Sequence, residues 1–274
     1  MVGIIAGGGS LPAALRAHLG ERGHAVRTIG IRGEVGPDAP CDAIVGIAEI
    51  EIVVREIERL GITHAVLIGG IAHRPRWQEG RIGWRSLPLV ANVLRALPRG
   101  DDAMLRAVVQ SFERIGVTVL GIHQIWPELL ASAGALGALA PSRTALGEID
   151  LALAAARVLG DLDVGQGAVA VGKRVIALEG LEGTDAMLER VASLRAAGRI
   201  NVRSPSGVLV KVAKPAQEVR ADLPTIGPDT VANAAAAGLR GIAIGACRAL
   251  IVDRERTIAD ADAAGLFVWG IELD

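Results

Sequence analysis

Apolar and polar residues alternate along the first half of the chain in blocks typical of successive strands and helices. Short runs of Val, Ile and Ala predict buried strands, and apolar residues spaced three and four apart predict amphipathic helices between them. Strands are expected at Val2–Ala6, Val26–Ile31, Ala65–Ile68 and Val117–Ile122, and helices at Leu11–Leu19, Ile50–Leu60, Leu87–Leu97 and Asp102–Ile115. Such alternation predicts a Rossmann-like, largely parallel sheet covered by helices.

The second half resumes this alternation after a stretch that lacks it. Residues 130–146 are rich in Ala, Gly, Ser and Pro without a clear period, which is typical of a linker. Beyond them we expect helices at Glu148–Leu159, Ala186–Ala197 and Pro228–Ala237, a hairpin of Gly167–Val171 with Val175–Leu178, and strands at Val208–Ala213, Gly241–Ile244, Ala249–Val252 and Leu266–Val268. The sequence therefore predicts an α/β protein with an N-terminal domain at 1–133, a linker at 134–147 and a second α/β domain at 148–274.

Charge and aromatic content exclude some classes of partner. The 274 residues include 29 Lys and Arg against 30 Asp and Glu, a net charge of −1, so no overall field draws the chain to nucleic acid. Aromatic residues make up 2%, too few for base-stacking platforms. We therefore expect no nucleic-acid partner, and any anionic ligand must be held by local groups.

We expect neither export of the chain nor its insertion into a membrane. No apolar run approaches the roughly 18–20 residues that span a bilayer, and Met1 leads directly into a strand-like run without a signal peptide. Cys41 and Cys247 lie far apart and form no metal-like pair, so reduced cysteines are expected. These features predict a cytoplasmic protein.

Two glycine-rich turns follow predicted strands, at the strand ends where open α/β sheets bind ligands. In the first, Gly8 and Gly9 allow a close backbone approach, and the helix that follows presents free N–H groups to an anion. A tight turn without a ligand is an equally good interpretation. The turn lacks the G-x-G-x-x-G spacing, which weighs against a nicotinamide nucleotide. In the second turn, His73 and Arg74 are candidates for a phosphate contact.

Acidic residues stand at the starts of two predicted helices. Asp101 and Asp102 follow Gly100, and Thr184 and Asp185 follow Gly183 in a similar phrase. Capping and a favourable helix dipole explain such residues without any ligand. The functional alternative is that both helix starts face one substrate and contact it.

Polar residues are densest between Lys211 and Val231. Asp222 precedes a proline-stiffened turn, Lys214 and Arg220 supply positive charge, and Pro228 stands where a helix begins. A carboxylate beside cations and a helix N-terminus suits a divalent ion and a pyrophosphate, whose charge must be neutralised before water attacks. A structural turn with solvated charges explains the same residues equally well.

Seven phrases in this order resemble one known family. They are IIAGGGSLP (4–12), GDDAML (100–105), LDVGQGAVAV (162–171), LEGTDAML (181–188), LVKVAKP (209–215), RADLPTIGPDTV (220–231) and AGLRGIAI (237–244). Together they span nearly the whole chain and resemble the I-type UDP-2,3-diacylglucosamine pyrophosphatase family of lipid A biosynthesis.

The resemblance implies a function, a site and partners. It implies hydrolysis of UDP-2,3-diacylglucosamine to UMP and 2,3-diacylglucosamine 1-phosphate (lipid X), with a divalent ion, usually Mg²⁺. It implies an active-site cleft between the two domains and a peripheral association with the inner face of the inner membrane, with a homodimer left open. The essential aspartate falls on Asp222, as base or metal ligand. The implied substrate contacts are Gly8, Gly9, Asp101, Asp102, Gln166, Thr184, Asp185 and Lys214, to which we add His73 from its turn.

Two other classes of function remain as alternatives. A non-catalytic protein that binds nucleotide sugars or lipids would use the same cleft. A nicotinamide-dependent oxidoreductase would use the first glycine-rich turn, but the second predicted strand does not end in the acidic residue that binds a ribose.

Overall fold

The computed structural model describes residues 1–71, 87–203, 205–215 and 217–273. Its contacts divide the chain into a first unit, formed by 1–127 and 218–222, and a second unit, formed by 128–217 and 223–274. Residues 134–147, expected to form a linker, supply β6 (Gly134–Ala135) and the start of α6 (Arg143–Asp161) to the second unit. Ser142 caps α6 by accepting a hydrogen bond from the Ala145 amide at 3.3 Å.

The first unit is built on a sheet in which all five strands are parallel. The order is β3-β2-β1-β4-β5, so β1 lies at the centre and the chain reverses its direction of travel across the sheet after β3. This confirms the predicted parallel sheet. The strands are β1 (Val2–Ala6), β2 (Val26–Ile31), β3 (Ala43–Val45), β4 (His64–Ile68) and β5 (Thr118–Val119).

Helices cover the first sheet. Residues of α2 and α4 form a core cluster with Ile5 and Ile29, while Ile4, on the opposite face, is also fully buried. A parallel sheet covered on both faces explains why its strands are apolar throughout instead of alternating. The helices are α1 (Leu11–Glu21), α2 (Ile50–Leu60), α3 (Leu87–Ala96), α4 (Asp101–Arg114) and α5 (Ile122–Ile125). Single 3₁₀ turns are formed by Leu97–Arg99 and by Pro127–Leu129, and the boundary between the two units follows Pro127.

The loops after β1 and β4 are bonded to each other through their backbones. The Gly8 amide donates to the Gly70 carbonyl at 2.8 Å, the Gly70 amide donates to the Gly8 carbonyl at 3.1 Å, and the Gly7 amide donates to the Ile68 carbonyl at 2.8 Å. A Cβ on Gly7 would lie 2.5 Å from the Gly70 oxygen, and Gly69 has a φ of +99°. Glycine is therefore required where the two loops meet.

The second unit is built on a mixed sheet. Its order is β6-β13-β11-β9-β7-β8, with β9, β11 and β13 parallel and the other three strands antiparallel to their neighbours. The strands are β7 (Gly167–Val171), β8 (Arg174–Leu178), β9 (Val208–Lys211), β11 (Gly241–Gly245) and β13 (Phe267–Ile271) besides β6, while β10 (Thr225–Ile226) and β12 (Leu250–Ile251) form a separate parallel pair.

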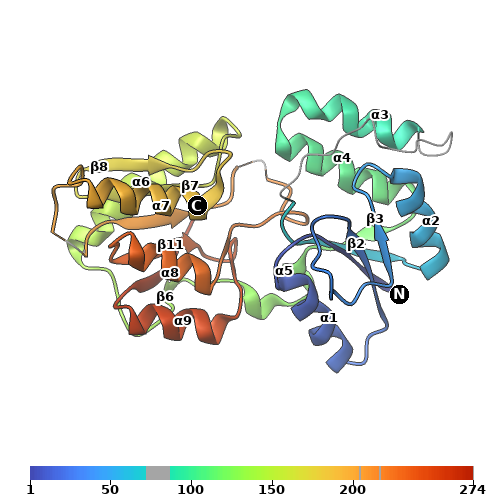
Figure 1. The fold of residues 1–274 in the computed structure, drawn as a ribbon, viewed down its shortest axis with the longest axis horizontal. Helices are drawn as coiled ribbons and strands as arrows, with labels where there is room; N and C mark the ends of the chain where they lie inside the picture. The colour runs from blue at the N-terminus through green and yellow to red at the C-terminus, as the bar shows by residue number, and fades with distance from the viewer. Residues whose placement is uncertain (72–86, 204, 216, 274) are drawn as a thin grey trace. The chain divides into compact units, whose positions relative to one another are not determined.

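Helices lie on both faces of the second sheet (Figure 1). Val208 and Val210 pack with α6 on one face, and Leu209 packs with the other helices on the opposite face. Successive residues of a strand point to opposite faces, so this strand buries both sets of side chains. The helices opposite α6 are α7 (Gly183–Ala196), α8 (Pro228–Ala236) and α9 (Arg254–Ala263).

The structure differs from the predicted elements in a few places. The predicted strand over 117–122 is reduced to β5 and is followed by α5. The elements α9, β3, β6 and β10 were not predicted. No helix among the described residues is long and apolar enough to cross a membrane.

We predict that Gly7→Ala destabilises the chain by about 1–3 kcal/mol, because the new methyl group overlaps a backbone oxygen that cannot move independently. Gly20→Ala is the matched control. No atom lies within 4 Å of the Cβ position of Gly20, which is in α1, so alanine there should stabilise by about 0.5–1 kcal/mol. Chemical denaturation measures both, and equal effects of the two substitutions would contradict the proposed contact between the loops.

Candidate functional site

The loop that carries Gly8 and Gly9 lies at the switch point of the first sheet. It follows β1, whose neighbours β2 and β4 are reached by connections that run in opposite directions, and open α/β sheets bind ligands at such points. Gly9 has a φ of +92° and leads into α1, whose Ser10 cap forms no side-chain hydrogen bond. The backbone amides at the start of α1 are therefore not covered by their own cap.

A small hollow lies beside this loop. Its lining includes Gly9, Arg16, Thr28 and Cys41, and its volume is about 40 Å³. A water molecule needs roughly 10–15 Å³ on this measure, so the hollow has room for water-sized groups but not for a nucleoside. Two interpretations of the glycine turn remain. It is either a tight turn without a ligand, or a turn that contacts only a small part of a ligand.

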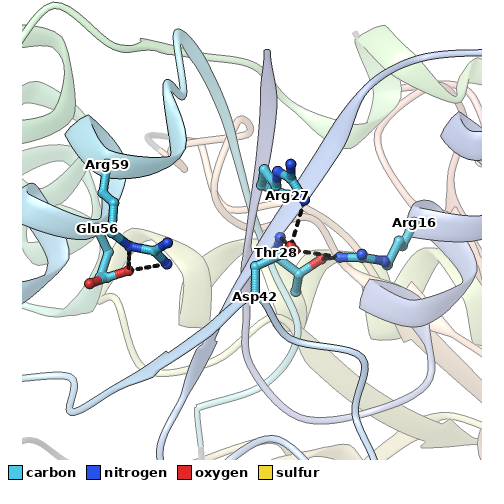
Figure 2. A network of polar contacts seen from close by, with 6 residues as sticks. All are labelled: Arg16, Arg27, Thr28, Asp42, Glu56 and Arg59. Atoms are coloured by element: carbon cyan, nitrogen blue, oxygen red, sulfur yellow. Dashed lines mark hydrogen bonds and ion pairs between the residues drawn. The ribbon is translucent and has the colours of Figure 1, made fainter.

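Arg16, at the wall of the hollow, is held by Asp42 (Figure 2). Asp42 accepts hydrogen bonds from Arg16 at 2.9 Å, from Arg27 at 2.9 Å and from the Thr28 amide at 2.8 Å. Burial raises the pKa of Asp42, but these hydrogen bonds lower it more, and the resulting pKa is about 2. The charge of Arg16 is therefore compensated within the first unit. Burial also raises the pKa of the neighbouring Cys41 thiol.

Asp101 and Asp102 occupy the first turn of α4, where the helix dipole favours acids. The capping residue is Gly100, with a φ of +101°, and it forms no side-chain hydrogen bond. The two aspartates therefore do not serve as the N-cap, the simplest explanation offered for them. Asp102 is buried, whereas Asp101 is exposed. His73 lies outside the described residues.

The segment that ends at Asp222 belongs to the first unit, although the residues before and after it belong to the second. Arg220 donates two hydrogen bonds to Glu218, both at 2.8 Å, and one to Glu113 of α4 at 2.7 Å. The Asp222 amide donates to the Glu218 carbonyl at 3.0 Å, and Ala221 packs against the core cluster of the first unit. These contacts fix the backbone of the loop.

The charge of Arg220 is compensated by its partners. Its hydrogen bond to Glu218 raises the pKa of the guanidinium and lowers the pKa of the Glu218 carboxyl. The sequence interpretation of Arg220 as a source of positive potential for a phosphate is therefore incomplete, because the same side chain is a structural anchor. After Asp222, Leu223 is buried and Pro228 begins α8, as predicted.

In the second unit, candidate residues lie together at one end of the sheet, where β7 begins and its neighbours β8 and β9 end. The Gln166 carbonyl accepts the Val212 amide at 3.0 Å, just beyond the paired residues Gly167 and Lys211. The Glu179 amide donates to the Gly167 carbonyl at 2.9 Å. The structure thereby brings together Gln166, the end of β9 and the loop that leads to α7.

The side chains at this edge are joined in short chains of hydrogen bonds. The Gln217 side chain donates to the side-chain Oε1 atom of Gln166 at 3.3 Å, and its own Oε1 accepts the Lys214 backbone amide at 2.8 Å. The Lys214 ammonium pairs with Asp163 at 2.5 Å, and the Lys214 side chain is only 11% exposed. The cation predicted to face a phosphate is thus already paired with a carboxylate.

The two candidates on α7 have different partners. Thr184 donates its hydroxyl hydrogen to Glu179 at 2.7 Å, and Asp185 accepts from Asn233 of α8 at 3.0 Å. Glu179 and Lys211, both buried, were missed by the sequence analysis. The sequence did contain a signal for each of them. Glu179 is a charged residue directly after a predicted strand, and Lys211 is a lysine inside a predicted strand that is otherwise apolar.

The described residues, which leave out 72–86, 204, 216 and 274, contain no group of three or more His, Cys, Asp or Glu side chains that could hold a metal ion. Mg²⁺ does not need such a cage, since it commonly takes one or two carboxylates together with substrate phosphates and water. A single carboxylate at Asp222, on a fixed backbone, fits that mode of binding.

Comparisons with known proteins cover nearly the whole chain. The model of the LpxI N-terminal domain matches residues 1–129, and the model of the LpxI C-terminal domain matches residues 132–269. The chain is 41% identical over 273 residues to the protein named UDP-2,3-diacylglucosamine pyrophosphatase LpxI of Caulobacter vibrioides, an alignment that covers 99% of this chain and 97% of that protein.

Asp42 should give the chain a defined sensitivity to acid. Its pKa is about 2 in the folded chain and about 3.9 when unfolded, so the ionised form stabilises the fold above about pH 4, and this contribution declines as the pH falls toward 2. Asp42→Asn should lower the free energy of unfolding at pH 7 by about 1–2 kcal/mol, a value reduced because solvent screens the half-exposed Arg27.

Urea unfolding between pH 7 and pH 2 measures this effect, and the difference between Asp42→Asn and the parent should close near pH 2. The exposed Asp38 on the same loop is the control, since Asp38→Asn should leave stability unchanged. A difference that persists unchanged at pH 2 would show that the charge of Asp42 is not responsible.

Proposed function

This chain belongs to the LpxI family, and we propose on that premise that it hydrolyses the pyrophosphate bond of UDP-2,3-diacylglucosamine. Water attacks one phosphorus, the bridging P–O bond breaks, and UMP and 2,3-diacylglucosamine 1-phosphate are released. The observation that carries the proposal is the end-to-end match to a pyrophosphatase of that name. Every element described above lies within the matched length.

Asp222 is the residue that we propose for catalysis. Its backbone is fixed by the hydrogen bond to Glu218 and by the anchoring of Arg220, so its carboxylate starts from a defined position. The carboxylate orients the attacking water, or it holds a divalent ion. Fixed placement of such a group lowers the barrier because little reorganisation is needed during the reaction.

The other candidates are proposed to bind the substrate. The Gly8 amide is bonded to the Gly70 carbonyl, so the amides at the start of α1, just after Gly9, are the donors proposed for an anionic oxygen. Gln166, Thr184, Asp185 and Lys214 present amide, hydroxyl, carboxylate and ammonium groups from the second unit, and Asp101, Asp102 and His73 complete the proposed set.

We propose Mg²⁺ as the divalent ion, held by Asp222 together with oxygens of the substrate. When bound, it would neutralise charge on the pyrophosphate. The residues of the chain provide one carboxylate for it, and the paired Lys214 and Arg220 add fixed positive charges whose directions are set by their carboxylate partners.

A peripheral location at the inner face of the inner membrane is part of the same proposal. The substrate carries two acyl chains, so it resides at a lipid surface, whereas no described helix can span a bilayer. We propose that the chain reaches this substrate from the surface of the bilayer.

Replacing Asp222 tests its role. Asp222→Ala and Asp222→Asn should each reduce turnover by at least about 100-fold, because the carboxylate that orients water or binds the ion is lost, while the substrate still binds. Release of UMP measures turnover and calorimetry measures binding. Asp260→Ala, which removes an exposed carboxylate from α9, is the control and should retain full activity.

Near-parental hydrolysis by Asp222→Ala would remove Asp222 from the mechanism. Binding of the substrate by the unchanged protein without any release of UMP would favour the alternative of a non-catalytic lipid or nucleotide-sugar binding protein.

Chelation tests the metal. Excess EDTA should abolish release of UMP, and Mg²⁺ in excess over EDTA should restore it, while the circular dichroism spectrum stays unchanged because no metal cluster of the described residues supports the fold. Hydrolysis that continues at its full rate in EDTA would contradict a role for a divalent ion. Loss of the folded spectrum would instead indicate a structural metal.

A further inference from the structure

Glu179, Gly167 and Lys211 lie side by side across three strands of the second sheet. Gly167 is paired with Lys211 of β9, and on its other side its carbonyl accepts the Glu179 amide just beyond β8. Residues directly opposite each other on neighbouring strands point to the same face. That face is the one on which Leu209 packs, and it carries α7 and α8.

Gly167 gives the Glu179 carboxylate its place. A Cβ on Gly167 would lie 2.5 Å from the Oε2 atom of Glu179, so the carboxylate occupies space that any other residue would fill. Glu179 is 7% exposed, and its Oε2 has no hydrogen-bond partner among the residues that the structure describes. A buried carboxylate oxygen left in this way is costly, and it calls for an explanation.

Lys211 supplies the opposite charge on the same face. It is 6% exposed, and its ammonium donates to the Thr225 carbonyl at 3.2 Å. Glu179 and Lys211 therefore lie on the same face of the sheet, on either side of Gly167. Glu179 is thus placed as a fixed hydrogen-bond acceptor at the sheet edge.

Thr184 is the residue that this acceptor controls. A hydroxyl has one hydrogen to donate and two lone pairs to accept with, and the hydrogen of Thr184 is donated to the Oε1 atom of Glu179 at 2.7 Å. Thr184 itself is only partly buried. Its hydroxyl can therefore offer a ligand nothing but an acceptor.

We propose that Glu179 is a positioning residue that fixes Thr184 as an acceptor, so that Thr184 selects a neutral N–H or O–H donor of the substrate and does not bind phosphate. The inference rests on the proposed function, because that substrate contains both kinds of group. Its pyrophosphate oxygens are acceptors, whereas donors occur on the uracil imide and ribose at one end and on the glucosamine at the other.

The test uses three probes on the full chain with Mg²⁺ present, namely UMP, 2,3-diacylglucosamine 1-phosphate and inorganic pyrophosphate. Thr184→Val should weaken one of the two products by about 3–10-fold, the range for one neutral hydrogen bond, and leave pyrophosphate within twofold. Thr184→Ser, which keeps the hydroxyl, should restore the affinity. Ser193→Ala, farther along α7, is the control and should change nothing.

The identity of the weakened product locates the donor. If it is UMP, then 3-methyl-UMP, which lacks the imide N–H, and 2′-deoxy-UMP, which lacks a ribose hydroxyl, distinguish the two donors. The analogue that lacks the group bound by Thr184 should bind the unchanged protein and Thr184→Val with equal affinity. Weakening of both products or of pyrophosphate would show that Thr184 binds phosphate and would overturn the proposal. Unchanged affinity for all three probes would overturn it as well.

Glu179 is tested through its coupling to Thr184. Glu179→Ala should reproduce the product-specific loss, and the double variant should lose no more than either single variant, because both changes remove the same oriented acceptor. Additive losses would mean that Glu179 acts through general stability. If Glu179→Ala does not fold, the Thr184 series still decides.

Calorimetry keeps this test separate from the proposed reaction. Affinities for the probes need no turnover, so failure to hydrolyse UDP-2,3-diacylglucosamine would count against the proposed function alone. Hydrolysis with no product-specific effect of Thr184→Val would count against the role of Glu179 alone.

Discussion

The place of Asp222 depends on the hydrogen bonds of Arg220. The guanidinium binds both oxygens of Glu218 two residues earlier and one oxygen of Glu113 on α4, which fixes residues 218–222 against the first unit. Charged, paired hydrogen bonds of this kind have a narrow range of angles, so they set direction as well as position. The segment before Arg220 and the segment after Asp222 belong to the second unit, so this anchor decides to which unit the carboxylate is attached.

Pairing of charges is a common feature of the candidate residues. Arg16 is bonded to Asp42, Lys214 to Asp163 and Arg220 to two glutamates. Each cation therefore points in a fixed direction, and the carboxylate beside it reduces the net charge of the pair. An anionic substrate would meet oriented hydrogen-bond donors more than a strong electrostatic field, which agrees with the nearly neutral charge of the whole chain.

Much of the fold follows from apolar patterning. The ranges of β1, β2 and α2 match those predicted. Runs of Val and Ile are compatible only with buried strands at the first two, and a stripe of apolar residues is compatible only with an amphipathic helix at the third. The pattern fails where burial is slight. In α9 the fully buried residues are Thr257 and Ala261, so no apolar stripe marks the helix, and β6 has two residues held by pairing with β13.

The candidate site could be predicted only in outline. Pro228 at the start of α8 and glycines at the turn after β1 have local causes, and both were predicted. Glu113, one partner of Arg220, and Asp163, the partner of Lys214, lie far away in the chain, and no local pattern could pair them. Whether a charged side chain is available to a ligand depends on such distant partners.

The interrupted path of the chain has a consequence for synthesis on the ribosome. The first unit emerges up to Pro127, but Ala221, which packs against its core, arrives only after all of residues 128–217. Before Ala221 has been made it cannot pack against this core, and before Arg220 has been made Glu113 cannot form its hydrogen bond with it. Domains generally fold in the order in which they are made, so the loop that carries Asp222 can settle against the first unit only after most of the second half has been made.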